Sequence, residues 1–173
     1  MQYLYFIQQA LIWLITIYWI YQLVVSICSL ITLKEKPLLE NKEHKFLAII
    51  PAHNEEAVVG NLIESLKNQT YPKDRYDICV IADNCTDKTK EVAENLGVKV
   101  FERHEEDPAK KTKGEALRLF LNTLLVDSNM DYDAFCVFDA DNIVDKNFIK
   151  AMNKHLCQGE EVVQGYRDIK NPT

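Results

Sequence analysis

Charge is missing from the start of the chain, because the residues from Met1 to Leu33 include no Asp, Glu, Lys or Arg. A cleaved signal peptide begins with a basic segment and has a shorter apolar core, so this start disfavours one. About 20 mostly apolar residues are enough for a helix to cross the hydrocarbon core of a membrane. We therefore predict one membrane-spanning helix within residues 1–33, with a buried hydrophobic helix as the alternative.

Basic residues are also lacking before this apolar stretch, whereas Lys34, Lys36 and Lys42 follow it. Positive charge favours the cytoplasmic side of a membrane, so we expect the rest of the chain to be cytoplasmic. The whole sequence is acidic, with a net charge of -6, and its basic residues cluster only in the short run 110–113. This balance argues against nucleic acid as a partner.

Cysteine pairs of the C-x-x-C type are absent, and the five cysteines are far apart in the chain. This spacing indicates neither a disulfide framework nor a zinc site. Cys79 and Cys136 lie in apolar runs, where a free cysteine behaves as a small core residue. The cysteines therefore fit a reducing compartment.

Beyond a polar linker at residues 34–45, short apolar runs alternate with amphipathic segments. The runs predict strands at residues 46–50, 76–82, 98–101, 134–138 and 161–164. The amphipathic segments predict helices after Asn54, from Thr86 to Leu96, from Gly114 to Val126 and from Lys146 to Leu156. Such alternation is typical of an α/β fold with a mainly parallel sheet flanked by helices. We assign this fold to residues 46–173.

Local signals set the expected helix bounds. Asn54 and Thr86 are expected to cap their helices, because short polar side chains accept hydrogen bonds from the first free amides. Gly97 is expected to end the second helix. The charged stretch 102–112, which contains Pro108, is expected to be a mobile loop.

Asp139 and Asp141 lie two residues apart, directly after the apolar run 134–138. Ligands of open α/β sheets bind at the carboxyl ends of the strands. Two carboxylates crowded there need a compensating cation, and Mg²⁺ or Mn²⁺ takes oxygen ligands while sharing them with substrate phosphates. We interpret the pair as a metal–diphosphate site, in which Asp141 contacts the metal and Asp139 supports the metal or a ribose. An acidic turn is the alternative.

Polar residues also follow two other predicted strands, at 51–56 and 83–86, so three loops converge on one edge of the sheet. Asp83 can accept hydrogen bonds from a base or a ribose, or serve only a helix-entry turn. His53 can stack on a base or donate a hydrogen bond, or be an ordinary loop histidine. Lys113 begins a predicted helix, where a cation is favoured only beside an anion such as phosphate, and a solvated lysine is the alternative.

Segments 49–56, 80–87, 113–114 and 138–141 together, in this order, resemble the family-2 glycosyltransferases. The resemblance covers roughly residues 46–172 and is strongest to membrane-attached cellulose-synthase-like and N-acetylglucosaminyltransferase types, which include enzymes of polysaccharide biosynthesis. It implies a GT-A, Rossmann-like fold. It also implies transfer of a sugar, with inversion, from a nucleotide sugar to a saccharide or lipid-linked acceptor, with UDP as the preferred nucleotide.

The resemblance further implies roles for individual residues. In the family, the loop matching Pro51 to Glu55 and the residue matching Asp83 contact the nucleotide. The carboxylate matching Asp139 approaches the ribose and diphosphate, and the one matching Asp141 holds Mn²⁺ or Mg²⁺. The candidate nucleotide-sugar ligands are thus Pro51, His53, Glu55, Asp83, Lys113 and Asp139, and the candidate metal ligands are Asp141 and Asp139.

A later acidic residue that deprotonates the acceptor in this family has no match here, because Glu160, Glu161 and Asp168 do not correspond to it. Direct displacement needs a positioned base. We therefore expect the chain to be the donor-binding part of a longer enzyme, truncated on its C-terminal side and inactive alone. One alternative is a membrane-tethered nucleotide-binding or interaction module without catalysis. A weaker one is a haloacid-dehalogenase-type phosphatase with Asp139 as nucleophile, since Ile143 stands where that family has Thr or Val.

Overall fold

The structure is a computed structural model that describes residues 1–29, 36–126 and 131–168. It divides into two units, Met1–Pro37 and Leu38–Thr173, and each is described by itself. The division of the chain into a span, a linker and a domain stays a prediction, and residues 30–33 of the expected span lie outside the described residues.

The first unit consists of helix α1, Gln2–Ser29. Within the described part of the chain, it is the one helix long and apolar enough to cross a membrane. Two of its polar side chains bond within the helix: Thr16 Oγ1 donates to the Ile12 carbonyl at 2.8 Å, and Gln22 Nε2 donates to the Tyr18 hydroxyl at 2.9 Å. Internal bonds of this kind lower the cost of polar groups in an apolar environment. A signal sequence and the core helix of a soluble protein meet the same length criterion, so the span remains a prediction.

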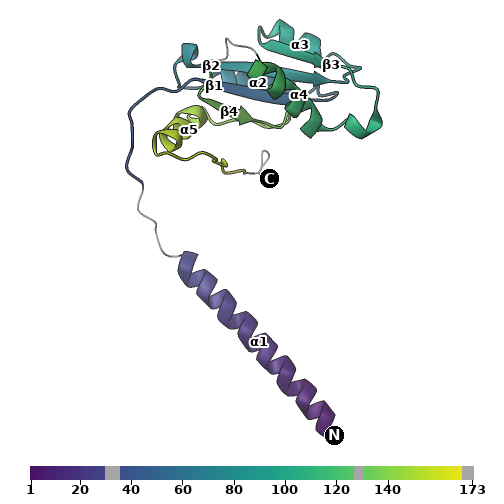
Figure 1. The fold of residues 1–173 in the computed structure, drawn as a ribbon, viewed down its shortest axis with the longest axis vertical. Coiled ribbons are helices and arrows are strands. Elements are labelled where there is room, and N and C mark those ends of the chain that lie inside the picture. The colour runs from purple at the N-terminus through teal and green to yellow at the C-terminus, as the bar shows by residue number, and fades with distance from the viewer. Residues whose placement is uncertain (30–35, 127–130, 169–173) are drawn as a thin grey trace. The chain divides into compact units, whose positions relative to one another are not determined.

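The second unit is built on a four-stranded sheet in the order β3-β2-β1-β4 (Figure 1). Its strands are β1 Phe46–Ala52, β2 Tyr76–Asp83, β3 Lys99–Arg103 and β4 Ala134–Val137. All three pairings are parallel, and Ile49 of β1 lies opposite Cys79 of β2 and Val137 of β4. The predicted parallel α/β sheet is confirmed.

Strand β1 is buried along its whole length, which explains its unbroken apolar sequence. Alternate residues face opposite sides of a strand, so β1 contributes to two cores. Phe46, Ala48 and Ile50 belong to the core that includes residues of α2, α3 and α5, whereas Leu47 and Ile49 pack with residues of α4. These helices are α2 Val59–Lys67, α3 Thr89–Asn95, α4 Lys113–Val126 and α5 Phe148–Cys157. Helices therefore cover both faces of the sheet.

The two expected helix caps are wrong. Helix α2 begins at Val59, well after Asn54, and α3 begins at Thr89 rather than after Thr86. Asn54 has a positive φ of 55°, and its Oδ1 accepts from the Thr86 amide at 2.8 Å, so these two residues bond to each other instead of capping helices. Gly97 follows α3 with a φ of 68°, a conformation that glycine adopts readily, as expected of a helix stop.

Two further expectations about secondary structure are corrected. Strand β3 extends through Glu102 to Arg103, and a 3₁₀ turn covers Pro108–Lys110, so the stretch 102–112 is not wholly a loop. No strand forms at residues 161–164 within the part of the chain that the structure describes. The apolar side chain of Val162 is 91% exposed, so this run lacks the burial that a strand needs.

Candidate functional site

A cavity of about 560 Å³ lies where β1, β2 and β4 end and α4 begins. Parallel strands bring their carboxyl ends to one edge of the sheet, which is why loops distant in sequence meet there. All seven candidate residues line this cavity: Pro51, His53, Glu55, Asp83, Lys113, Asp139 and Asp141. The structure therefore brings together every residue named from the sequence as a candidate nucleotide-sugar or metal ligand.

The loops after β1 and β2 form a rim of the cavity, and hydrogen bonds join one loop to the other. Asn54 and Asn84 both have positive φ, 55° and 51°, and this left-handed conformation is one that asparagine tolerates better than most residues. The Glu56 side chain accepts from the Lys88 amide at 2.8 Å, and the Glu56 amide donates to Asp87 at 3.0 Å. The Glu55 amide donates to Thr89 Oγ1 at 2.8 Å. The ends of β1 and β2 are thus held in one fixed arrangement.

His53 also takes part in this cross-link. Its Nδ1 lies 2.7 Å from the Asp83 carbonyl oxygen. A carbonyl only accepts, so Nδ1 carries a proton and donates it. In the neutral imidazole this leaves Nε2 as an acceptor at an exposed position beside the cavity. Asn54 Nδ2 lies 3.5 Å from this Nε2, so His53 is bonded on one side and remains exposed beside the cavity.

Asp83 is bonded to Arg103 in a buried ion pair. Arg103 is 5% exposed and Asp83 8% exposed, and Nη1 of Arg103 lies 2.8 Å from Oδ1 of Asp83. The Asn84 side-chain Nδ2 donates to the same oxygen at 2.8 Å, and among the described residues no hydrogen bond reaches Oδ2. Nη2 of Arg103 bonds the Lys110 carbonyl at 2.8 Å, so the same guanidinium fastens the loop beyond β3. This geometry fixes Asp83 as a hydrogen-bond acceptor at the end of β2.

Asp139 is held by two cations. Lys113 Nζ bonds Oδ1, and Arg167 Nη2 lies 3.1 Å from Oδ2. The hydrogen bond from Lys113 is the main reason that the pKa of Asp139 falls below its usual range. All three side chains are at least 40% exposed, so these contacts are open to water and to exchange with a ligand.

Asp141 is exposed and lines the same cavity as Asp139. Together they offer carboxylate oxygens and no sulfur or nitrogen, a donor set that suits a hard divalent cation. Asp139 is already balanced by Lys113 and Arg167. The residues present therefore fit Mg²⁺ or Mn²⁺.

Sequence reasoning missed four polar residues at this site. Arg103 bonds Asp83, Arg167 bonds Asp139, and Asn84 and Lys111 line the cavity. Asn84 lies in the polar loop 83–86 predicted from the sequence, so its position after a strand could have indicated a site residue. Arg103 ends a strand within a highly charged stretch, and only the sheet register, which places Asp83 opposite it, reveals the pairing.

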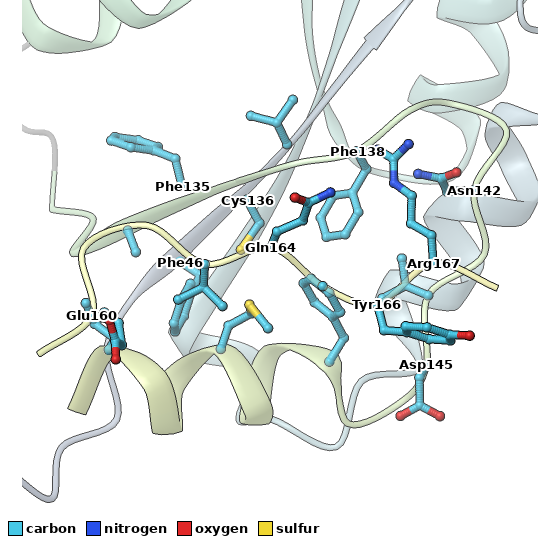
Figure 2. Close-up of a pocket in the computed structure, with 18 of the residues that line it drawn as sticks. Phe46, Phe135, Cys136, Phe138, Asn142, Asp145, Glu160, Gln164, Tyr166 and Arg167 are labelled. Carbon is cyan, nitrogen blue, oxygen red and sulfur yellow. The ribbon is translucent and has the colours of Figure 1, made fainter. Parts of the chain in front are cut away.

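A second cavity of about 380 Å³ lies beside the edge strand β4. It is lined by α5 and the following segment 160–168, and Figure 2 shows Glu160 at one end and Arg167 at the other. Gly165 packs closely here, because a Cβ at this position would lie 2.7 Å from a ring carbon of Phe148. Since Arg167 also bonds Asp139, the segment that lines this second cavity reaches the first.

Comparisons with known proteins agree on one family. The family model described as Glycosyl transferase family 2 matches residues 47–173. The probable glycosyltransferase YdaM of Bacillus subtilis is 32% identical over 149 residues, which cover 83% of this chain and 34% of YdaM. The beta-monoglucosyldiacylglycerol synthase of a Synechocystis species is 31% identical over 107 residues, which cover 59% of this chain and 21% of the synthase.

A solved structure supports the same grouping. It is the glucosyl-3-phosphoglycerate synthase of Mycobacterium tuberculosis in complex with Mn²⁺, UDP and glucosyl-3-phosphoglycerate. It is 26% identical with a TM-score of 0.50, and the match covers 66% of this chain and 40% of the synthase. The match thus spans about a third of YdaM, 21% of the Synechocystis synthase and 40% of the Mycobacterium synthase.

Proposed function

The chain belongs to glycosyltransferase family 2, and we propose that its cavity of about 560 Å³ binds the donor, a UDP-sugar, together with Mn²⁺ or Mg²⁺. The observation that carries this proposal is the convergence of four carboxylates and two lysines in one cavity at the carboxyl edge of the sheet. The family match favours a transferase over the phosphatase alternative.

Each end of the cavity suits a different part of the donor. Oδ2 of Asp83 faces no protein donor among the described residues, so it can accept the N–H of a uracil ring or a ribose hydroxyl. His53, Pro51 and Glu55 form the wall beside it. This end of the cavity recognises the nucleoside.

The other end suits the diphosphate. Lys113 can exchange its bond with Asp139 for one with a phosphate oxygen, because both groups are substantially exposed. Asp139 then faces the ribose or the cation, and Asp141 holds the cation. A bound Mn²⁺ or Mg²⁺ supplies positive charge that stabilises the diphosphate as a leaving group.

Titration of the chain with UDP, with and without Mn²⁺, tests this function. Metal-dependent binding is expected, and CDP should bind more weakly, because Asp83 can accept the N3–H of uracil whereas N3 of cytosine carries no proton. The Asp83→Asn variant should lose the preference for UDP. Absence of nucleotide binding under all conditions would overturn the donor site and favour the interaction-module alternative.

For the whole protein we propose inverting transfer to a saccharide or lipid-linked acceptor. A lipid acceptor is supported by the relationship to an enzyme named beta-monoglucosyldiacylglycerol synthase and by the apolar helix α1. The chain would be anchored by α1 with residues 46–173 in the cytoplasm. Protease treatment of sealed membrane vesicles tests this orientation: residues 46–173 should be digested only where the cytoplasmic face is outside.

We also propose that the 173-residue chain alone binds the donor without transferring it at a useful rate. All four carboxylates of the donor cavity have donor-side roles in this scheme, which leaves none of them to deprotonate an acceptor. Robust sugar transfer by the purified chain would contradict this part of the proposal while leaving the donor site intact.

A further inference from the structure

A cluster of three potential metal ligands lies at the opposite edge of the sheet from the donor cavity. Glu40 and His44 precede β1, and Cys157 is the last residue of α5. A carboxylate oxygen, an imidazole nitrogen and the Cys157 sulfur lie within 4.8 Å of one another. No spacing typical of zinc ligands is visible in the sequence, because these ligands come from segments more than 100 residues apart that only the fold brings together.

The cluster is held in place by backbone and side-chain bonds. The Leu39 amide donates to the Cys157 carbonyl at 2.7 Å, and the His44 amide donates to Asn153 Oδ1 at 3.1 Å. The Tyr71 hydroxyl donates to the His44 carbonyl at 2.8 Å. The segment before β1 is therefore fastened to α5 with the three ligand side chains already gathered. Such preorganisation is what a metal site needs.

The two ring nitrogens of His44 each face a carboxylate. Nε2 lies 2.9 Å from Glu40 Oε1, while Nδ1 is buried without a hydrogen-bond partner, 3.4 Å from Asp133 Oδ2. In a neutral imidazole only one nitrogen carries a proton. If Nε2 donates to Glu40, the lone pair of Nδ1 faces a carboxylate, which is unfavourable in a residue only 6% exposed.

A second ring proton or a metal ion at Nε2 removes this conflict. With a metal ion at Nε2, Nδ1 carries the ring proton and donates it to Asp133, the arrangement in which a carboxylate orients a metal-bound histidine. Cys157 is a free, buried thiol, and its Sγ lies 3.4 Å from the Lys42 carbonyl. We propose that Glu40, His44 and Cys157 bind Zn²⁺, with Asp133 as the outer partner of His44.

The chemistry of the donors favours zinc over the cation of the donor cavity. Thiolate, imidazole and carboxylate together form a set that Zn²⁺ accepts in tetrahedral sites, with water in the fourth position, whereas Mg²⁺ and Mn²⁺ prefer oxygen. Zn²⁺ binds sulfur at about 2.3 Å and nitrogen or oxygen at about 2.0–2.2 Å. The side chain of Glu40 is 48% exposed, so it is free to make the small movement that closes the site.

Charges and protons balance when Zn²⁺ binds. The Cys157 thiol releases its proton to solvent as the Zn–S bond forms, and His44 keeps one proton, on Nδ1. The thiolate and the Glu40 carboxylate then neutralise the two positive charges of Zn²⁺. The bound Zn²⁺ would therefore link the segment that leads into β1 to the end of α5.

Cobalt titration of the metal-free full chain in detergent, under reducing conditions, tests the site. Co²⁺ replaces Zn²⁺ and gives a near-ultraviolet band when a thiolate binds it, a signal that oxygen-only sites do not produce. The wild-type chain should show this band, and excess Zn²⁺ should abolish it. Asp141→Asn should leave the band unchanged, which separates this site from the donor cavity.

Variants identify the ligands. Cys157→Ser should abolish the band, and Glu40→Gln and Asp133→Asn should each weaken affinity by roughly ten- to 100-fold. Cys85→Ser is the matched control, because Cys85 Sγ also lies 3.4 Å from a backbone carbonyl, that of Ala52. If Cys157→Ser does not fold, the cobalt affinity of Glu40→Gln tests the site instead, because Glu40 is partly exposed and its substitution should not prevent folding. The absence of a band in the wild-type chain, or equal affinity in wild type and Glu40→Gln, would overturn the proposal.

Discussion

The two ends of the donor cavity hold their aspartates in different ways. Asp83 is buried and bonded to a guanidinium that is itself only 5% exposed. Asp139 is bonded to Lys113 and Arg167, whose side chains are 49% and 71% exposed. The ion pair at the Asp83 end is therefore buried and fixed in position. The ion pairs at the Asp139 end are exposed and can be exchanged for contacts with a ligand.

This difference suits the two parts of a nucleotide sugar. A nucleoside has the same shape before and after transfer, so a rigid acceptor such as Asp83 is appropriate. The diphosphate gains negative charge as the sugar leaves, and an exposed cation such as Lys113 can exchange its contact with Asp139 for one with a phosphate oxygen. The fixed end of the cavity thus suits the nucleoside, and the exposed end suits the diphosphate.

The largest expected effect is at Arg103. Arg103→Met leaves the buried Asp83 carboxylate without its cation, and breaking a buried pair in this way costs about 3–5 kcal/mol. Urea unfolding should show this loss, and UDP affinity should fall with it. Arg118→Met is the matched control, because Arg118 is an exposed arginine paired with Glu115, where we expect about 0.5 kcal/mol or less. Equal stability of the two variants would mean that the Asp83 end is not rigid.

The next effect concerns the cation. Asp141→Asn should remove the increase in UDP affinity produced by Mn²⁺, a coupling of roughly 5- to 150-fold in typical two-ligand systems. Stability in urea should be unchanged because Asp141 is exposed. Asp131→Asn, at a side chain 92% exposed outside the cavity, is the control and should retain the full metal effect. A metal effect that survives in Asp141→Asn would argue for a different metal ligand.

A smaller effect is expected at Lys113. Lys113→Met should weaken UDP binding by roughly tenfold, about 1.4 kcal/mol, because one cation that faces the diphosphate is lost. Uridine, which has no phosphate, should bind the variant and the wild type equally. Lys150→Met on the exposed side of α5 provides the control. Equal losses for uridine and UDP would show that Lys113 acts on the nucleoside end instead.

The smallest effect is a shift in titration. Lys113 and Arg167 lower the pKa of Asp139, so their stabilisation is complete above the ordinary carboxyl pKa of about 3.9 and is lost as the pH falls through the lowered value. In Lys113→Met the pKa of Asp139 should rise toward the ordinary value, and carboxyl ¹³C NMR can measure it. Arg167→Met should give a smaller rise, because Lys113 is the main cause of the shift. An unchanged pKa in Lys113→Met would show that the two side chains do not interact in solution.

The two central strands, β1 and β2, were predictable because they are buried almost throughout and so appear as nearly unbroken apolar runs. The edge strands β3 and β4 are only partly buried, so their apolar signal is weaker. The cavity was predictable for a related reason, since polar residues after such runs must gather at one edge. The start of α2 was not, because Asn54 bonds Thr86 across the rim, and a local capping rule cannot anticipate a partner from another loop. Arg103 and the Glu40–His44–Cys157 cluster depend in the same way on distant segments that meet only after folding.

The paired turns at Asn54 and Asn84 have a consequence for the evolution of donor choice. Because several bonds join the β1 and β2 loops, a substitution in one changes the position of the other. A relative that prefers a different nucleobase would need compensating substitutions in both loops. Efforts to redesign this enzyme family for new donors should therefore randomise residues 53–56 and 84–89 as one linked library rather than one loop at a time.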